Sequence, residues 1–501
     1  MKLKIVYCLI LASQVFLACS QTTATSELGP VTTYSPSNRP RMAAEWEPAI
    51  GVLITWPLSL PHKLVSELAK DTKLYLLIES RDAQKEAIKW FSTWGIMPDQ
   101  VKFITAPQGI DASWTRDWGP PAVFTHDGTM KLADGKYLYA TPVTGLACDD
   151  PLLFIYKDDN NQIVQTKIDD KIPDYVASSI DIEMVNLPFV FTGGNVISDG
   201  QKTAFSTCAL SNENKYTGVS DEKFLHDVKQ LLGIEQYHFI SNFEEEGIQH
   251  IDCYMKLLDE ERILVMRPPA DHPSYEQYEG MITHELSRLK NAYGRPYQIL
   301  RMDTDRFRGD ELAAYVNALI LNRNIYVPLY GIPQDSMALK QWTDAMPGYT
   351  VKGFDFVLSR EPALQPHAKE IYKGIGWTGG DALHCRTRAI WDPNMIYISV
   401  DRLPNKVPKA KEYQIKAILK DYSKGSLDPD MLKVMWRVKG KEEWKESKLV
   451  RTQVPDQYTS TIQGGQAGVT IEYYVTAHSN WGSNHTMPVV APKGFYQFTI
   501  D

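Results

Sequence analysis

The C-terminal part of the chain alternates between apolar and polar side chains over several short segments. From Val469 to Ala477 every second residue is apolar, and residues 433–438 and 496–500 follow the same period of two. Because successive side chains of a strand point to opposite faces of a sheet, this pattern predicts half-buried strands of an antiparallel sheet. Glycine, asparagine and proline residues between the segments predict the turns.

A proline-bounded linker at residues 401–408 separates these strands from the rest of the chain. We predict an immunoglobulin-like sandwich over residues 408–501, a region of about 95 residues, which is a typical size for that fold. A structural role is favoured for it over a ligand site, since a fold alone does not define a function. The chain of 501 residues is long enough for a second domain, which we place at residues 41–402.

The N-terminus has the pattern of a secretory signal. Two lysines precede an apolar run over residues 5–18, which is too short to span a membrane and ends at Cys19. Residues 16–19 resemble a bacterial lipobox, so we predict a signal peptide over residues 1–19 and lipidation of Cys19. Cleavage of an ordinary signal peptide nearby is the alternative. Residues 20–40, rich in Ser, Thr, Pro and Asn, predict a flexible tether.

The charge of the chain limits its partners. The formal net charge is −8 and no cluster of basic residues is present, which argues against nucleic acid as a partner and suits a cationic substrate. The signal predicts export to the bacterial cell envelope, facing the periplasm or the cell surface, with the lipid as the only contact with a membrane. Four cysteines lie beyond the signal region, too few in a chain of this length for a disulfide framework: Cys148, Cys208, Cys253 and Cys385.

A polar segment at residues 379–387 contains the first candidate catalytic residue, Cys385. Most buried cysteines lie in apolar runs and act as small hydrophobic residues. Arg386 follows Cys385 directly, and its positive charge would favour the thiolate that a nucleophile needs. His384 would face the other side of a strand, so we assign it a structural role. A partly buried structural cysteine is the alternative for Cys385.

Two further segments supply an imidazole and two carboxylates. His250 and Asp252 are two residues apart, so on a strand they would share one face, and Asp117 lies in the segment Ser113–Pro120. Two aspartates can hold the two sides of a planar guanidinium, a thiolate can attack its central carbon, and a histidine can transfer protons. The set of residues therefore favours hydrolysis of a guanidinium group.

Two other chemistries compete with this interpretation. His250, Asp252 and Cys253 are metal-ligand residue types, but they lack the paired cysteine or histidine spacing of zinc sites. In papain-like proteases the cysteine precedes the histidine, the reverse of the order here. We therefore expect neither a metal nor an organic cofactor, and we expect Cys253 to be a packing residue.

The combined motifs resemble the guanidino-group-modifying superfamily, specifically its agmatine deiminase and Porphyromonas-type peptidylarginine deiminase branch. The resemblance extends from about Arg41 to Val400 and into the C-terminal domain. The agmatine deiminase-like segments are Met42–Pro48, Gly51–Pro57, Ser113–Pro120 and Thr192–Asn195. The segments similar to the Porphyromonas-type enzyme are Asp381–Thr387, His250–Cys253 and Asn317–Asn322.

The resemblance implies a role for each motif residue. Cys385 would be the nucleophile and His250 the general acid and base, while Asp117 and Asp252 would bind the guanidinium. Asn317 would be an active-site residue, and Trp114 would line the substrate channel. The implied fold is an α/β pentein, a propeller of five ββαβ-type units. A region of about 360 residues divides into five units of about 70, a size compatible with such repeats.

The sequence departs from the Porphyromonas-type pattern where the substrate would be selected. Residues 137–143 contain none of the arginines with which that enzyme binds a free C-terminal carboxylate, and Gly380 stands where it has threonine. We expect conversion of peptidyl or protein arginine to citrulline with release of ammonia, without a strong preference for C-terminal arginine. Conversion of agmatine to N-carbamoylputrescine, or of another small guanidine, is the first alternative. A catalytically idle surface lipoprotein that only binds ligands is the second.

Overall fold

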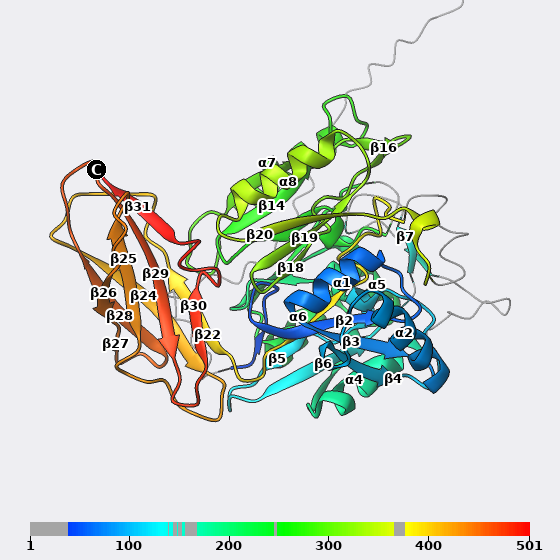
Figure 1. Ribbon diagram of the computed structural model, residues 1–501. Coiled ribbons are helices and arrows are strands. Elements are labelled where there is room, and N and C mark those ends of the chain that lie inside the picture. Colours follow the sequence, from blue (N-terminus) through cyan, green and yellow to red (C-terminus); the bar gives the residue numbers. More distant parts are fainter. Residues whose placement is uncertain are drawn as a thin grey trace, which may run out of the picture. The chain divides into compact units, whose positions relative to one another are not determined.

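The computed structural model in Figure 1 describes residues 39–138, 140–143, 148, 153–155, 168–244, 248–364 and 376–501. The predicted signal peptide, Cys19 and most of the predicted tether lie outside these described residues. Residues Tyr34–Asp501 form one compact unit. Within its described part, a mixed α/β region is followed by a region built only from strands, in agreement with the predicted change of fold class.

Five sheets of the α/β region share one pattern in the described residues. The first is β1 (Arg41–Met42), β5 (Ala122–Phe124), β6 (Met130–Lys136) and β9 (Met184–Val190). The second is β10 (Ile197–Ser198), β11 (Thr203–Thr207) and β12 (Gln236–Ile240), and the third is β13 (Met255–Leu257), β14 (Arg262–Arg267) and β15 (Gln298–Asp303). The fourth is β18 (Leu319–Leu321), β19 (Asn324–Leu329) and β20 (Thr350–Asp355), and the fifth is β21 (Arg388–Trp391), β2 (Ala49–Thr55), β3 (Lys73–Ile78) and β4 (Val101–Thr105).

In each sheet an antiparallel pair is extended by a parallel strand, and helices lie between the parallel strands in the sequence. These helices are α1 (His62–Asp71), α2 (Arg81–Thr93), α4 (Ile172–Ile180), α5 (Cys208–Tyr216), α6 (Asp221–Leu232), α7 (Tyr275–His284) and α8 (Gln334–Ala345). No sheet closes on itself among the described strands, so the five-unit propeller stays a prediction.

The local sequence explains where such a helix begins and ends. The side chain of Ser220 accepts a hydrogen bond from the backbone N–H of Lys223 and caps the start of α6. Gly233, with φ of 72°, ends the helix in a left-handed conformation that glycine adopts without strain. Phe224 and Val228 are spaced four residues apart and are fully buried, so α6 presents one apolar face to the core.

Short pieces complete the α/β region. The two-stranded sheets are β7 (Ala140–Val143) with β8 (Leu153–Ile155), and β16 (Arg306–Arg308) with β17 (Glu311–Leu312). The one-turn helices are α3 (Thr115–Trp118), η2 (Pro98–Gln100), η3 (Asp169–Lys171), η4 (Gly193–Asn195), η5 (Ile251–Cys253), η6 (Leu286–Arg288) and η7 (Leu358–Arg360).

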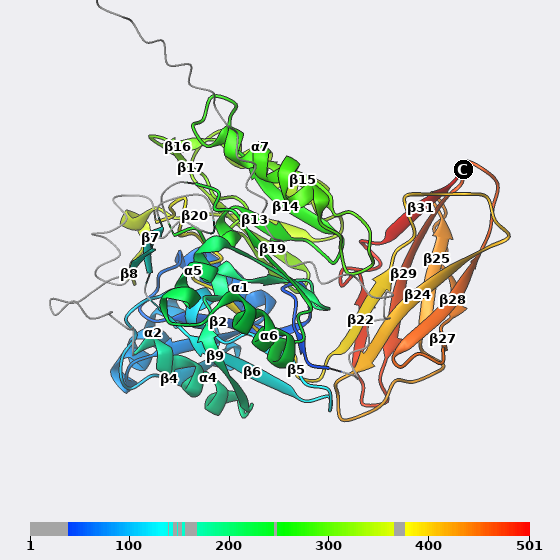
Figure 2. The same cartoon turned by 180° about the vertical axis from the view of Figure 1, so that it is seen from behind.

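The C-terminal region consists of two sheets (Figure 2). One contains β22 (Ile396–Asp401), β24 (Glu412–Asp421), β28 (Gln457–Gln463) and β27 (Val450–Arg451). The other contains β23 (Lys406–Val407), β31 (Tyr496–Ile500), β29 (Thr470–His478), β25 (Lys433–Val438) and β26 (Lys445–Lys448), with β30 (Asn484–Met487) paired to β29. The three predicted alternating segments are strands, whereas the immunoglobulin-like topology stays a prediction.

The all-β region begins earlier than the predicted linker. Strand β22 pairs antiparallel with β24, although we placed residues 396–401 in the catalytic domain. The run Ile396–Val400 is buried on both faces and does not alternate, so its sequence did not distinguish it from the strands before it.

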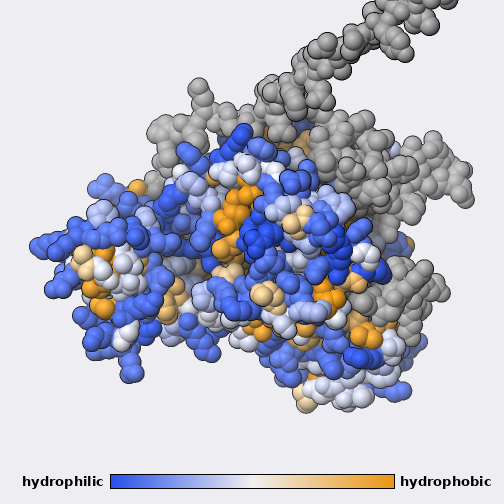
Figure 3. All heavy atoms as spheres, turned by 90° about the horizontal axis from the view of Figure 1, so that it is seen from above, coloured by the Kyte–Doolittle hydropathy of each residue, from blue (hydrophilic) through white to orange (hydrophobic). Residues whose placement is uncertain are grey.

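Hydrophobic side chains on the surface do not form one continuous area on the face shown in Figure 3. Figure 3 shows hydrophobic patches separated by hydrophilic surface on the face seen from above. None of the helices in the described ranges is both long enough and apolar enough to span a bilayer.

Arg41 links the two regions through a fully buried guanidinium. It donates to the Glu47 carboxylate and to the Gly200 carbonyl, the latter at 3.0 Å. Its guanidinium carbon lies 3.9 Å from the ring centre of Tyr397 in β22. The pairing of Arg41 with Glu47 therefore compensates a charge that has no access to water.

We predict that Arg41→Ala lowers the free energy of unfolding by about 3–5 kcal/mol, because it leaves the buried Glu47 without its cation. The midpoint of denaturant unfolding measures the effect. The matched control is the double variant Arg41→Met with Glu47→Leu, which removes both charges and should lose less stability. A single variant with a wild-type midpoint would contradict the prediction.

Candidate active site

Five short segments at equivalent places in the five sheets converge on one site. Each segment directly precedes a strand of the antiparallel pair in its sheet: Asp117 precedes β5, Gly194 precedes β10, Asp252 precedes β13, Asn317 precedes β18 and Cys385 precedes β21. The common position explains how motifs spread over almost 270 residues meet. It also brings together all of Asp117, His250, Asp252, Asn317 and Cys385, which the sequence singled out.

Gly194 marks the centre of the carboxylate and imidazole groups. A Cβ atom built on this glycine would lie 2.4 Å from Asp117 Oδ1, 3.1 Å from His250 Nδ1 and 3.4 Å from Asp252 Oδ2. Only glycine allows the backbone to come this close to three functional side chains. Its own N–H donates to Asp117 Oδ1 at 3.1 Å. The fold therefore requires glycine at position 194, because a side chain would not fit there.

The thiol of Cys385 is buried and held by Asn317. The Asn317 side-chain amide donates to Cys385 Sγ at 3.2 Å. Its oxygen accepts the backbone N–H groups of His384 at 2.9 Å and Cys385 at 3.4 Å, which fixes the orientation of the amide. Asp252 Oδ2 lies 3.9 Å from the same sulfur. A carboxylate, an amide donor and a thiol thus border one small volume.

His250 is paired with Asp117. Their Nδ1 and Oδ1 atoms are 3.4 Å apart, and both side chains are buried. Burial alone would lower the pKa of His250, but the negative charges of Asp117, Asp252 and Glu213 outweigh it and raise the pKa to about 9. His250 is therefore protonated at neutral pH and can donate a proton to a leaving group.

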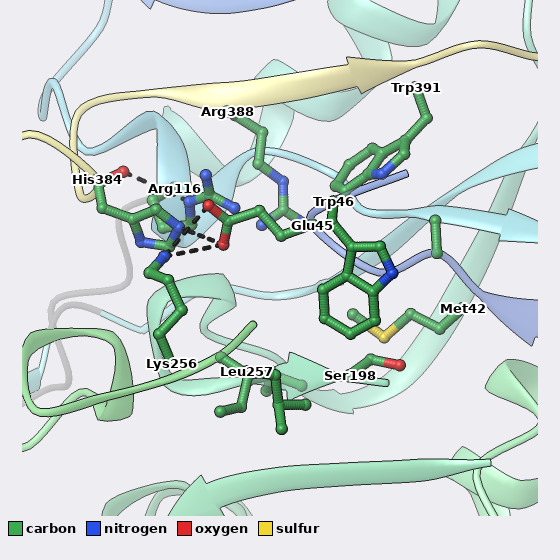
Figure 4. A pocket seen from close by; sticks show the side chains of 13 residues that line it. Met42, Glu45, Trp46, Arg116, Ser198, Lys256, Leu257, His384, Arg388 and Trp391 are labelled. Carbon is green, nitrogen blue, oxygen red and sulfur yellow. Dashed lines mark hydrogen bonds and ion pairs between the residues drawn. The ribbon is translucent and has the colours of Figure 1, made fainter. Parts of the chain in front are cut away.

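A chain of buried charges supports Asp252. His384 Nδ1 lies 2.6 Å from Asp252 Oδ2, and its Nε2 lies 2.9 Å from Glu45 Oε2. Glu45 is in turn paired with Lys256 Nζ at 3.0 Å. Figure 4 shows His384, Glu45 and Lys256 facing one another beside a small pocket. Burial alone would raise the pKa of Asp252, but the hydrogen bond from His384 helps to bring it below the ordinary value.

Two buried guanidinium groups line the same pocket. Arg116 and Arg388 are each almost fully buried, and both approach Glu45 in Figure 4. Burial and the neighbouring charge of Arg116 bring the pKa of Arg388 well below its ordinary value. Their positive charge helps to keep several carboxylates ionised in a site with little access to water.

Sequence reasoning missed this supporting set. Glu45 belongs to the segment Met42–Pro48 and Arg116 adjoins Asp117, so both lie in motifs that were recognised. Lys256 and Arg388 carry a weaker signal, a single charged residue within a short and otherwise apolar strand.

Three local expectations were wrong. His250 and Asp252 do not lie on a strand, because His250 precedes the one-turn helix η5, whose Ile251 N–H donates to Asn195 Oδ1 at 3.1 Å. His384 does not face away from the site, because Cys385 lies in a loop and not on a strand.

Arg386 is paired with Asp381, a partner that the sequence did not predict. Its guanidinium donates to both Asp381 oxygens at 2.8 Å and to the Ser59 carbonyl at 2.9 Å. A hydrogen bond from Cys253 favours the Cys385 thiolate, but burial and the carboxylates of Asp252, Asp381 and Asp117 raise the pKa of Cys385 overall. A bound cation would offset those carboxylates and favour the thiolate.

Among the described residues the cysteines form one disulfide and one pair of buried free thiols. Cys148 and Cys208 form the disulfide, with their Cα atoms 4.7 Å apart, and this single bond does not contradict the expectation of no disulfide framework. Cys253 lies beside Cys385, and the ligand atoms of Asp252, Cys253 and Cys385 lie within 4.8 Å of one another. This group has the donor types for a soft divalent metal, so the expectation that no metal is needed stays a prediction.

Trp114 and the substrate-selecting residues receive less support. Trp114 is half-buried, and its backbone carbonyl accepts a hydrogen bond from the N–H of Asp117 at 2.9 Å. Trp114 is therefore the N-cap residue of α3. Its predicted place in a substrate channel stays a prediction. Most of the predicted substrate-selecting stretch 137–143 lies outside the residues whose side chains are described.

The mixed α/β fold is similar to solved deiminase structures. The agmatine deiminase of Enterococcus faecalis aligns with a TM-score of 0.51 at 17% sequence identity, over 72% of this chain and 98% of that chain. A substrate-bound Cys-to-Ser variant of the C. jejuni agmatine deiminase aligns with a TM-score of 0.51 at 14% identity, over 70% of this chain and 96% of that chain. At these identities the likeness shows the fold alone.

Sequence comparisons identify the family. A Vibrio parahaemolyticus protein named as an agmatine deiminase is 24% identical over 388 residues, which are 69% of this chain and 95% of its own length. The model of the Porphyromonas-type peptidyl-arginine deiminase family matches residues 41–357, and the chain belongs to this family. The matched segment contains Asp117, His250, Asp252 and Asn317 and ends before Cys385. Membership indicates a hydrolase that acts on C–N bonds of guanidine compounds.

The raised pKa of His250 generates a prediction about pH. If protonated His250 is required, activity should fall as the pH rises through about 9. Glu213 is buried, which raises its own pKa to about 7, so it is ionised at pH 9 and stabilises the imidazolium. Glu213→Gln removes that negative charge, lowers the pKa of His250 and should move the alkaline limb of the kcat/KM profile to lower pH.

A matched control for this profile is Glu260→Gln. Glu260 is also buried, with its pKa raised to about 8, but the charged groups that act on it are Arg402, Asp259 and Glu261 rather than His250. Its substitution should leave the alkaline limb in place. An unchanged limb in Glu213→Gln, or an equal shift in both variants, would contradict the assignment of His250.

Proposed function

We propose that this protein hydrolyses the guanidinium group of arginine side chains in peptides or proteins, giving citrulline and ammonia through a covalent adduct on Cys385. The observation that supports this most is the position of Asp117, His250 and Asp252 around Gly194, with the Cys385 thiol 3.9 Å from Asp252. A planar cation can be bound by the two carboxylates while its central carbon faces the sulfur.

The reaction follows from these positions. Asp117 and Asp252 accept hydrogen bonds from the guanidinium and orient it, and the cation favours the Cys385 thiolate. The sulfur adds to the central carbon, and protonated His250 donates its proton to the departing ammonia. The C–N bond breaks and a thiouronium adduct remains. His250, now neutral, takes a proton from water, whose oxygen replaces the sulfur and leaves a ureido group.

The family model and the named relatives point to different substrates. The name of the matching family refers to peptidyl arginine as the substrate, whereas the relatives are named as agmatine deiminases. We favour peptidyl arginine because the predicted export separates the enzyme from cytoplasmic agmatine and exposes it to proteins. Agmatine, or another small guanidine, remains the alternative substrate. A catalytically idle binding protein is disfavoured, since it would not need a thiol, an imidazole and two carboxylates together.

A substrate panel tests the proposal. Ammonia release is measured with agmatine, free arginine, a peptide with an internal arginine, an amidated arginine peptide and one ending in free arginine, each with and without chelator. We expect the internal and amidated peptides to be turned over at least as well as the free-ended one. A preference of about 100-fold for the free C-terminal arginine, or about 2.7 kcal/mol, would contradict the proposed selectivity.

Two variants connect this panel to the mechanism. Cys385→Ser should abolish turnover, since a hydroxyl at its ordinary pKa is a much weaker nucleophile than a thiolate. Asp117→Asn should cost about 2–5 kcal/mol in kcat/KM, the scale for losing one partner of a buried charge pair. Full activity in Cys385→Ser would refute the covalent mechanism. Turnover of agmatine alone would move the assignment to the alternative, and loss of activity in chelator would show a metal requirement.

We also propose that the protein is exported and anchored through a lipid on Cys19. The basic start, the short apolar run and the lipobox-like residues 16–19 support this, although they lie outside the described residues. Cys19→Ala should abolish lipidation and release the protein from the membrane fraction, because the several lipid chains on Cys19 would be its only membrane anchor. A mature N-terminus at any residue other than Cys19, found by mass spectrometry, would refute lipidation.

A further inference from the structure

The two free cysteines among the described residues share their surroundings. Cys253 in η5 and Cys385 before β21 are both buried. The Asn317 amide lies 3.2 Å from Cys385 Sγ and 3.6 Å from Cys253 Sγ. The Gly380 carbonyl lies 4.0 Å and 3.5 Å from the same two sulfurs. One amide and one carbonyl therefore hold both thiols at the same place.

Asp252 completes the arrangement. Its Oδ1 is 3.6 Å from Cys253 Sγ and its Oδ2 is 3.9 Å from Cys385 Sγ, so the two thiols lie along one carboxylate. The two sulfurs are within 4.8 Å of one another. A disulfide has an S–S distance of about 2.05 Å, so the two sulfurs must move toward one another for the bond to form.

The proposed reaction gives Cys253 no step, yet it lies beside the nucleophile. The hydrogen bond between the sulfurs favours the thiolate of Cys385, while the same contact and burial raise the pKa of Cys253 well above its ordinary value. The two thiols are therefore unequal: Cys385 is the one that ionises first and meets an electrophile first. Cys253 stays protonated next to it.

We propose that Cys253 is a resolving thiol that forms a reversible disulfide with Cys385 when the protein meets a hydroperoxide. The bond would inactivate the catalytic thiol and protect it from irreversible oxidation. The effect on activity rests on the proposed function of Cys385, whereas formation of the bond depends only on the two neighbouring thiols.

The chemistry balances with hydrogen peroxide as the oxidant. The Cys385 thiolate attacks one peroxide oxygen and the O–O bond breaks, which gives a sulfenic acid and hydroxide. The hydroxide takes up the proton that Cys385 lost on ionisation and becomes water. Cys253 sulfur then attacks the Cys385 sulfur, the S–O bond breaks, and the hydroxyl leaves with the Cys253 proton as a second water. Two thiols are oxidised to one disulfide and one peroxide is reduced to two waters. A dithiol reductant reverses the step by thiol–disulfide exchange.

The chain itself already contains an oxidised cysteine pair. Cys148 and Cys208 form a disulfide, which is typical of proteins that mature in an oxidising compartment. A catalytic thiol in such surroundings is exposed to the oxidants that made the first bond. A neighbouring thiol that turns oxidation into a reversible event is therefore useful at Cys385 and nowhere else in the described chain, where Cys253 and Cys385 are the free cysteines.

The experiment uses the full-length protein, which is first reduced with dithiothreitol and then separated from the reductant. It is treated with hydrogen peroxide in the presence of chelator, so that no metal binds to the thiols. Remaining thiols are alkylated at low pH and the digested peptides are analysed by mass spectrometry. We expect a peptide pair linked through Cys253 and Cys385, lost again after dithiothreitol. Ammonia release should fall and return in parallel.

The matched variant is Cys253→Ala. It cannot form the linked pair, so peroxide should carry its Cys385 to sulfinic or sulfonic acid, and dithiothreitol should recover about tenfold less of the starting activity than in the wild type. Wild-type protein in which Cys385 becomes sulfinic acid while Cys253 stays alkylatable would overturn the proposal. If no substrate is hydrolysed but the linked pair still forms, the proposed function fails and the resolving role of Cys253 stands.

Discussion

The buried carboxylate of Asp252 must be compensated by positive charge and hydrogen-bond donors, and much of the site is arranged around that requirement. A carboxylate without any exposure costs several kcal/mol unless it is paired. His384 meets this need at 2.6 Å, and Glu45 and Lys256 extend the pairing. The charge of one residue therefore connects the N-terminal segment, β13 and the loop that carries the nucleophile. The site is therefore preorganised for its substrate, since the carboxylate that would hold the guanidinium is fixed in position before the guanidinium binds.

The candidate catalytic residues could be predicted because their types follow from the proposed reaction. A guanidinium needs carboxylates, its carbon needs a strong nucleophile, and the leaving ammonia needs a proton. Asp117, His250, Asp252 and Cys385 meet those needs and lie together in the structure. The strands at 433–438 and 496–500 were also predictable, since one face of each meets a core and the other meets water.

The remaining features depend on contacts between distant segments, which a local pattern does not contain. The turn at His250 is set by Asn195, more than fifty residues away, whose side chain accepts the Ile251 N–H. The direction of Arg386 is set by Asp381 and the Ser59 carbonyl, so adjacency in sequence did not imply contact with Cys385. Strand β22 was assigned to the wrong region because a strand buried on both faces has no alternation to reveal its partner.

The pairing of β21 with β2 ties the last strand of the α/β region to one of its first. A ribosome releases Cys385 only after nearly all the other active-site residues, and the sheet that anchors it must wait for a partner made more than 300 residues earlier. Contacts of such long sequence separation make folding slow. An emerging or truncated chain would then possess the carboxylates and the imidazole but no nucleophile. The order of synthesis would itself keep the protein inert until Cys385 and β21 have been made.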